Sequence, residues 1–170
     1  MKISTYQHDL DIVVGILPKL VKLYIHGNKN CASRLGVFLS TMSHRKEFQT
    51  NYISKSAIQA KPQNRCREHA MGITLVAKML LDACVSLEVD SSDPTQIDSF
   101  IKRHAFQNHT TRKENRKLVK IYKQNPGVSW IQAYELANIV LYEGRGSGRG
   151  RRKSTYKHIP YTKLKKYPLG

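Results

Sequence analysis

The clearest local signal in the chain lies at residues 109–122, which read HTTRKENRKLVKIY. The segment begins as a short extended run, and Thr110 or Thr111 is suited to cap a helix, with Glu114 near the capping-box position. Apolar residues then recur at helical spacing, at Leu118, Ile121 and Tyr122. A brief strand that turns at once into a capped amphipathic helix indicates a protein that mixes both kinds of element.

Most of the remaining periodicity is helical. Apolar residues recur every three or four positions in residues 9–26, 30–44 and 70–84. Pro18 lies inside the first of these helices and predicts a kink or a division there. A shorter helix is expected at Pro94, capped by Asp93, and a last one from Ser129 to Leu141. We therefore predict a mainly α fold with a short β-hairpin, of the α+β class, in one compact domain.

The charge is unusual. The chain of 170 residues contains 29 Lys and Arg against 12 Asp and Glu, a formal net charge of +17. From Gly144 onward there is no acidic residue, so we divide the chain into a mostly helical domain, 1–143, and a flexible basic arm, 144–170. Tyrosines interleaved with cations suit phosphate contact and stacking. The candidate contacts are Arg145, Arg149, Arg151, Arg152, Lys153, Tyr156, Lys157, Lys163, Lys165 and Lys166.

Such an excess of positive charge favours a polyanionic partner, because a polyanion relieves the self-repulsion of the compact state. Nucleic acid is the predicted partner, DNA before RNA. A membrane is not a predicted partner, because Pro18, Lys19 and Lys22 interrupt the apolar run at residues 12–25. We expect a cytoplasmic protein, and the apolar N-terminal helices offer an interface for a homodimer.

The sequence contains one group of residues that could form a catalytic site. It begins at Arg67-Glu68-His69, where a carboxylate that can hold a divalent ion precedes an imidazole that can take a proton from water. Farther along the chain, Asn115 falls near the first turn of the helix described above, where its amide oxygen could complete a metal site.

These residues resemble the HNH, or His-Me finger, endonucleases, particularly the small forms of phages and mobile elements. The resemblance covers about residues 54–122. It rests on the pair Glu68-His69 and on the downstream threonine-rich cap with Glu114-Asn115 and Leu118.

The resemblance implies a metal-dependent DNA endonuclease that hydrolyses phosphodiester bonds. It makes His69 the general base and Glu68 and Asn115 ligands of Mg²⁺ or Mn²⁺. A nearby cation, Arg67 or Arg65, would stabilise the charge on the phosphate. The alternative is a non-enzymatic DNA- or RNA-binding protein, architectural or part of a ribonucleoprotein. The two differ in their need for a divalent metal: the nuclease requires it for turnover, whereas the binder only loses affinity as salt rises.

Overall fold

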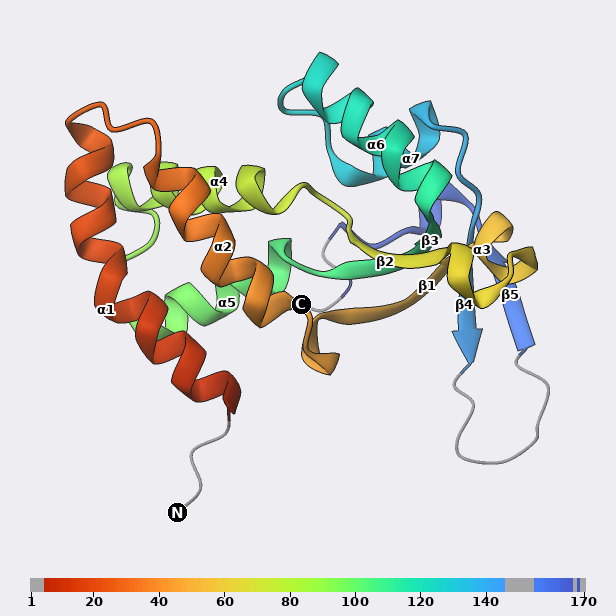
Figure 1. Cartoon of the computed structure of the whole chain (residues 1–170), viewed down its shortest axis with the longest axis horizontal. Helices are drawn as coiled ribbons and strands as arrows, with labels where there is room; N and C mark the ends of the chain where they lie inside the picture. Colours follow the sequence, from red (N-terminus) through yellow and green to blue (C-terminus); the bar gives the residue numbers. More distant parts are fainter. Residues whose placement is uncertain (1–4, 146–154, 167, 169–170) are drawn as a thin grey trace. The chain divides into compact units, whose positions relative to one another are not determined.

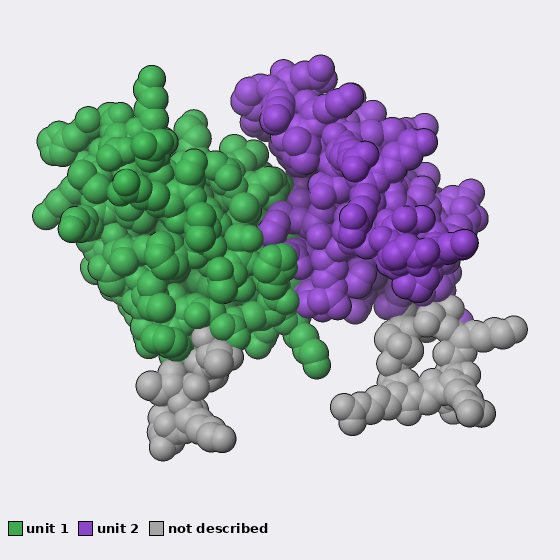
Figure 2. All heavy atoms as spheres, in the orientation of Figure 1, with its two compact units in different colours: residues 1–48, 71–106, 169–170 green, residues 49–70, 107–168 purple. Residues whose placement is uncertain are grey.

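The computed structural model describes residues 5–145, 155–166 and 168. The chain divides into two compact units (Figure 2). Unit 1 consists of residues 1–48, 71–106 and 169–170, and unit 2 of residues 49–70 and 107–168. The described part of unit 1 is helical, whereas unit 2 contains a five-stranded sheet with helices, which confirms the α+β class.

Unit 1 is a group of packed helices (Figure 1). They are α1 (Thr5–Ile25), α2 (Cys31–Ser43), the short 3-10 helix η1 (Lys46–Phe48), α4 (Ile73–Val85) and α5 (Pro94–His104). Each helix contributes to one apolar core, in which Leu17, Leu35, Leu80 and Ile97 are wholly buried. The hydrophobic effect on these side chains holds the helices together.

Two expectations for unit 1 can be compared with the structure. Of the two outcomes predicted at Pro18, a kink or a division, the division does not occur, because α1 continues through this residue. Leu17 and Leu20 are buried on either side, and their packing outweighs the lost backbone hydrogen bond. The predicted cap of α5 is confirmed, since the Asp93 carboxylate accepts from the backbone N–H of Thr95 at 2.8 Å. In the described part of the chain, no helix combines the length and hydropathy needed to cross a bilayer.

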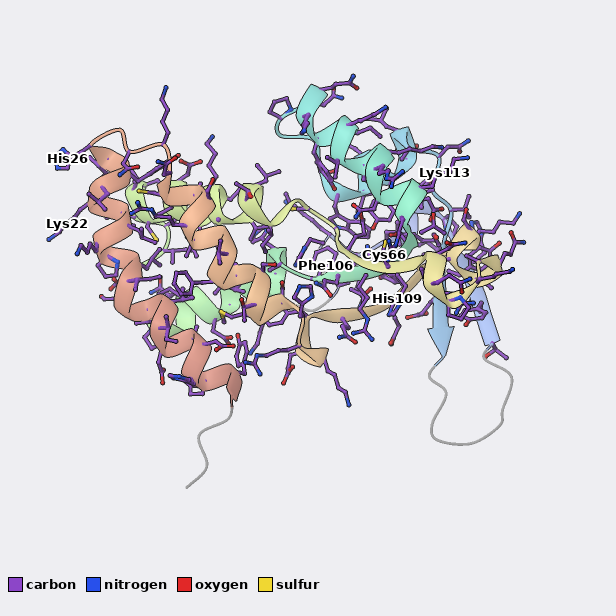
Figure 3. The ribbon with its side chains drawn as sticks, viewed as in Figure 1. Lys22, His26, Cys66, Phe106, His109 and Lys113 are labelled. Carbon is purple, nitrogen blue, oxygen red and sulfur yellow. The ribbon has the colours of Figure 1, made fainter. Side chains whose placement is uncertain are left out.

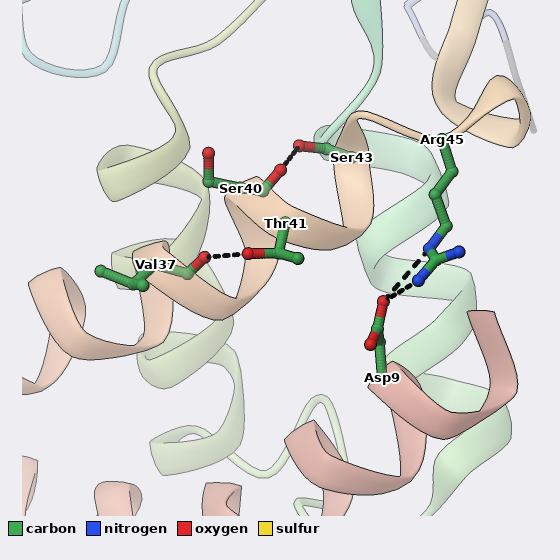
Figure 4. A network of polar contacts seen from close by, with 6 residues as sticks. All are labelled: Asp9, Val37, Ser40, Thr41, Ser43 and Arg45. Atoms are coloured by element: carbon green, nitrogen blue, oxygen red, sulfur yellow. Dashed lines mark hydrogen bonds and ion pairs between the residues drawn. The ribbon is translucent and has the colours of Figure 1, made fainter. Parts of the chain in front are cut away.

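An ion pair joins the end of α2 to α1 (Figure 4). Arg45 donates from Nε to the Asp9 carboxylate at 3.1 Å and from its terminal nitrogen to the same oxygen. Hydroxyls of the last turns of α2 bond back to carbonyls of the preceding turn, Thr41 to Val37 and Ser43 to Ser40. The end of α2 is thus held both by bonds within the helix and by an ion pair to α1.

The sheet of unit 2 has the order β2-β3-β1-β4-β5. Its strands are β1 (Gln49–Ser54), β2 (Arg65–His69), β3 (Gln107–Thr111), β4 (Leu141–Arg145) and β5 (Thr155–Ile159). β1 and β3 are parallel, and every other pair of neighbours is antiparallel. The sheet is therefore larger than the short hairpin that the sequence predicted.

Unit 2 also contains helices in addition to the sheet. They are α3 (Lys55–Gln59), α6 (Arg112–Gln124) and α7 (Trp130–Leu136), with short 3-10 helices η2 (Pro62–Asn64) and η3 (Tyr161–Lys163). The last predicted helix ends earlier than expected, because Asn138 adopts a positive φ of 57° and β4 begins at Leu141.

The predicted boundary at residue 144 falls inside β4. β5 lies in the expected basic arm, yet it pairs antiparallel with β4, so residues 155–159 belong to the sheet. Backbone hydrogen bonds to an existing strand hold a basic segment that shows no hydrophobic alternation of its own. Residues 146–154 of the expected arm lie outside the described residues.

Candidate nucleic-acid interface

Strand alternation sorts the residues of β2 and β3 onto two faces of the sheet. Three cross-strand pairs define them: Arg67 with His109, Glu68 with Asn108, and His69 with Gln107. Successive side chains of a strand point to opposite faces. Glu68 and Asn108 therefore share one face, and the other two pairs share the opposite one.

α6 packs against β2 and β3, and a chain of hydrogen bonds joins the face that bears Glu68 to α7. Thr50 donates to the Asn108 side-chain oxygen at 2.6 Å, Asn108 donates to the Tyr134 hydroxyl at 3.1 Å, and Tyr134 donates to Glu68 at 2.5 Å. All four side chains are buried. The chain joins β1, β3, α7 and β2, so it fixes the helix on the sheet.

Glu68 lies at the end of this chain and away from solvent, with 5% of its surface exposed. Burial raises its pKa to about 8, although the hydrogen bond from Tyr134 acts in the opposite direction. The pKa of Tyr134 is raised well above its ordinary value by burial and by Glu68. At neutral pH the Glu68 carboxyl therefore keeps its proton, which makes it a poor ligand for a divalent ion.

The opposite face bears Arg67, His69 and His109. The Gln107 amide donates to Nε2 of His69 across 3.1 Å, which leaves that ring nitrogen acting as an acceptor. Burial lowers the pKa of His109, and so do the charges of Arg67 and Arg65. A neutral histidine beside an exposed arginine is compatible with contact to a phosphate.

The predicted site residues do not converge as expected. Glu68 and His69 are neighbours in sequence but point to opposite faces of β2, because the segment is a strand. Asn115 is half-buried on α6. Within the described residues, no three His, Cys, Asp or Glu side chains group as metal ligands. The expected site, with Glu68 and Asn115 as metal ligands and His69 as general base, is thus divided: Glu68 is buried on one face of β2 and His69 lies on the other. β2, β3 and α6 do follow one another in ββα order, with residues 70–106 between the strands.

α6 is the most basic described element. Its capping box is confirmed: Thr111 accepts from the backbone N–H of Glu114 at 3.2 Å, and the Glu114 carboxylate accepts from Thr111. Ser54 also donates to Glu114 at 2.7 Å, which anchors the helix to β1. The only acid of α6 is therefore turned inward. Its cations are all exposed, at Arg112, Lys113, Arg116, Lys117, Lys120 and Lys123.

This basic helix was missed as a binding surface by sequence reasoning, although the signal was present. Six cations on the polar side of an amphipathic helix are visible in residues 112–123. Figure 3 labels Lys113 near the start of α6.

Charge is distributed very unequally between the units. Unit 2 contains 19 of the 29 Lys and Arg and four of the 12 Asp and Glu, so 19 minus 4 gives it +15 of the formal +17. The ion pairs among the described residues are Arg45–Asp9, Lys78–Asp82 and Lys102–Asp98, and all belong to unit 1. Apart from Lys166, the described cations of unit 2 thus have no carboxylate partner at ion-pair distance among the described residues.

The predicted contacts of the basic arm fall into two groups. Tyr156 and Lys157 are exposed on β5, and Lys163, Lys165 and Lys166 are exposed beyond it. The Trp130 indole donates to the Lys166 carbonyl at 2.8 Å, which fastens this end of the chain to α7. Arg145 ends β4. Arg149, Arg151, Arg152 and Lys153 lie outside the described residues.

Comparisons of the chain with family models, curated proteins and solved structures found no match. The class of the protein is therefore given by its own fold and charge. It is an α+β protein with a nearly neutral helical unit and a strongly cationic sheet unit.

Proposed function

We propose that this chain is a nucleic-acid-binding protein and that unit 2 makes the contact, with DNA as the first ligand to test. The observation that carries the proposal is the concentration of +15 in unit 2, where the six cations of α6 form no ion pair among the described residues. Unpaired cations attract phosphates and release counterions when they bind.

The exposed side of α6 is the core of the proposed surface. Lys120 and Lys123 lie in its later turns and project into solvent, while Leu118 and Glu114 hold the inner side against the sheet. A rigid helix presents cations at fixed spacing, so less conformational entropy is lost on binding than when a flexible tail becomes ordered. Contacts of this kind position a nucleic acid without reading its sequence.

Binding of a fluorescein-labelled DNA duplex, followed by anisotropy over a salt series, tests the proposal. The Lys120→Gln/Lys123→Gln variant should bind about tenfold more weakly, with a salt slope smaller by about two. Lys22→Gln/Lys29→Gln is the matched control, because it removes the same charge from exposed positions of unit 1. Equal losses in both variants, or no binding by the wild type, would contradict the proposal.

A metal-dependent DNA endonuclease is the second candidate. The ββα order of β2, β3 and α6 favours it, as does the common face of Arg67 and His69. On this face His69 would take the proton from water and Arg67 would contact the phosphate. The need for Mg²⁺ or Mn²⁺ comes from the resemblance alone.

Supercoiled plasmid, incubated with Mg²⁺, Mn²⁺ or EDTA, tests this candidate. His69→Ala should remove metal-dependent nicking, and His26→Ala, an exposed histidine of unit 1, should keep it. Intact plasmid with the wild type, together with a salt-sensitive gel shift, would leave only the binding function.

A further inference from the structure

Unit 2 contains a cavity of about 580 Å³ at the start of α6. Its walls come from four segments: α3, η2, the first turns of α6, and the turn after α7. That volume is within the range of small-molecule sites, roughly 300–1,000 Å³. All of its lining residues belong to unit 2.

The wall formed by α6 is strongly cationic. Arg112, Lys113, Arg116 and Lys117 line it, against a single carboxylate, Glu114. Glu114 is buried and accepts hydrogen bonds from Ser54 and Thr111, so its carboxylate is already hydrogen-bonded within the protein. No ion pair within the described residues uses the four cations. The cavity therefore holds an uncompensated positive charge.

The other walls supply neutral polar groups. Asn64 and Asn138 line the cavity from η2 and from the turn after α7. The positive φ of Asn138, 57°, places its side chain on a tight turn held by the bond from the Ile139 N–H to the Tyr134 carbonyl. Amides of this kind hydrogen-bond phosphate oxygens or base edges beside the charge supplied by arginine and lysine.

We propose that this cavity binds the phosphomonoester of a nucleotide, either free or at the end of a nucleic-acid strand. The inference rests on the proposed nucleic-acid binding and adds a ligand group to it. A continuous duplex is about 20 Å across and cannot enter such a cavity, whereas one nucleotide with its phosphate can. A terminal phosphate carries close to two negative charges, so it gains more from four cations than a backbone diester does.

The test compares the affinities of the protein for two 12-nucleotide DNA strands that are identical except for a 5′-phosphate or a 5′-hydroxyl. Fluorescence anisotropy measures both affinities. Wild-type protein should prefer the phosphorylated strand by about fivefold. Arg116→Gln/Lys117→Gln should bring the two affinities within about twofold of each other. Lys120→Gln/Lys123→Gln removes the same charge from the same helix outside the cavity, and should weaken both strands while keeping their ratio.

Calorimetry with 5′-AMP and with adenosine separates the two sources of the phosphate. AMP binding that adenosine does not share, and that Arg116→Gln/Lys117→Gln abolishes, assigns a free nucleotide. A fivefold strand preference without AMP binding assigns a strand end. If AMP binds but neither strand does, the cavity is supported and the proposed nucleic-acid function fails. Equal affinity for both strands together with no AMP binding overturns the cavity inference, and leaves nucleic-acid binding in place if the strands bind.

Discussion

Replacing Glu68 by Gln should stabilise the protein, and by an amount that depends on pH. The Gln amide oxygen can still accept the hydrogen bond from Tyr134, but it has no proton to lose. Burial raises the pKa of Glu68 from 4.5 to about 8 in the folded state. Since the folded pKa lies above the unfolded one, the carboxyl's contribution to stability is complete below pH 4.5 and is lost as pH rises through 8.

The size of the effect follows from linkage. Each pKa unit corresponds to about 1.4 kcal/mol, so between pH 5 and pH 7 wild-type stability should fall by about 2–3 kcal/mol relative to Glu68→Gln. Urea unfolding followed by the fluorescence of Trp130, the only tryptophan, measures this within unit 2. The control Glu143→Gln, at an exposed position of β4, should show no such trend. A difference between Glu68→Gln and wild type that is equal at pH 5 and pH 7 would refute a protonated Glu68.

Three further outcomes are expected. Tyr134→Phe leaves Glu68 without a donor and the Asn108 amide without an acceptor, and should lower the free energy of unfolding by about 1–3 kcal/mol in urea titrations. Thr111→Ala removes the cap of α6 and should cost about 1 kcal/mol, which a thermal melt would record as a drop of about 2–4 °C in Tm. Raising salt from 50 to 200 mM should weaken DNA binding by the wild type by at least about a hundredfold. That dependence should be shallower for Lys120→Gln/Lys123→Gln.

Local rules predicted the parts of the fold that depend on neighbouring residues. The capping box at Thr111 and Glu114 and the cap at Asp93 are both formed as expected, because each involves groups within three positions of one another. Core helices with a strong apolar periodicity, such as α4, were also located within a few residues of their ends.

The sheet was harder to predict, because its strands are fixed by distant partners. β2 and β5 contain mostly polar residues, without the alternation that marks a half-buried strand. β2 is held by β3, whose residues lie about 40 positions away, and β5 by β4. The arrangement of Glu68 and His69 in the candidate site was difficult to predict for the same reason. Once residues 65–69 form a strand, Glu68 and His69 must separate, and Tyr134, 66 positions from Glu68, becomes its partner.

The burial of acidic side chains connects the stability of unit 2 with its proposed function. Unit 2 has four carboxylic acids, and two of them, Glu68 and Glu114, are buried and hydrogen-bonded within the protein. Only Glu135 and Glu143 are exposed. A protonated Glu68 adds no negative charge to the potential that an approaching phosphate meets. The burial of this carboxyl lowers the stability of the protein, and the loss increases as pH rises. Glu68→Gln should therefore leave DNA affinity unchanged at pH 7, whereas a carboxylate that held a metal at the site of cleavage would make the same variant inactive.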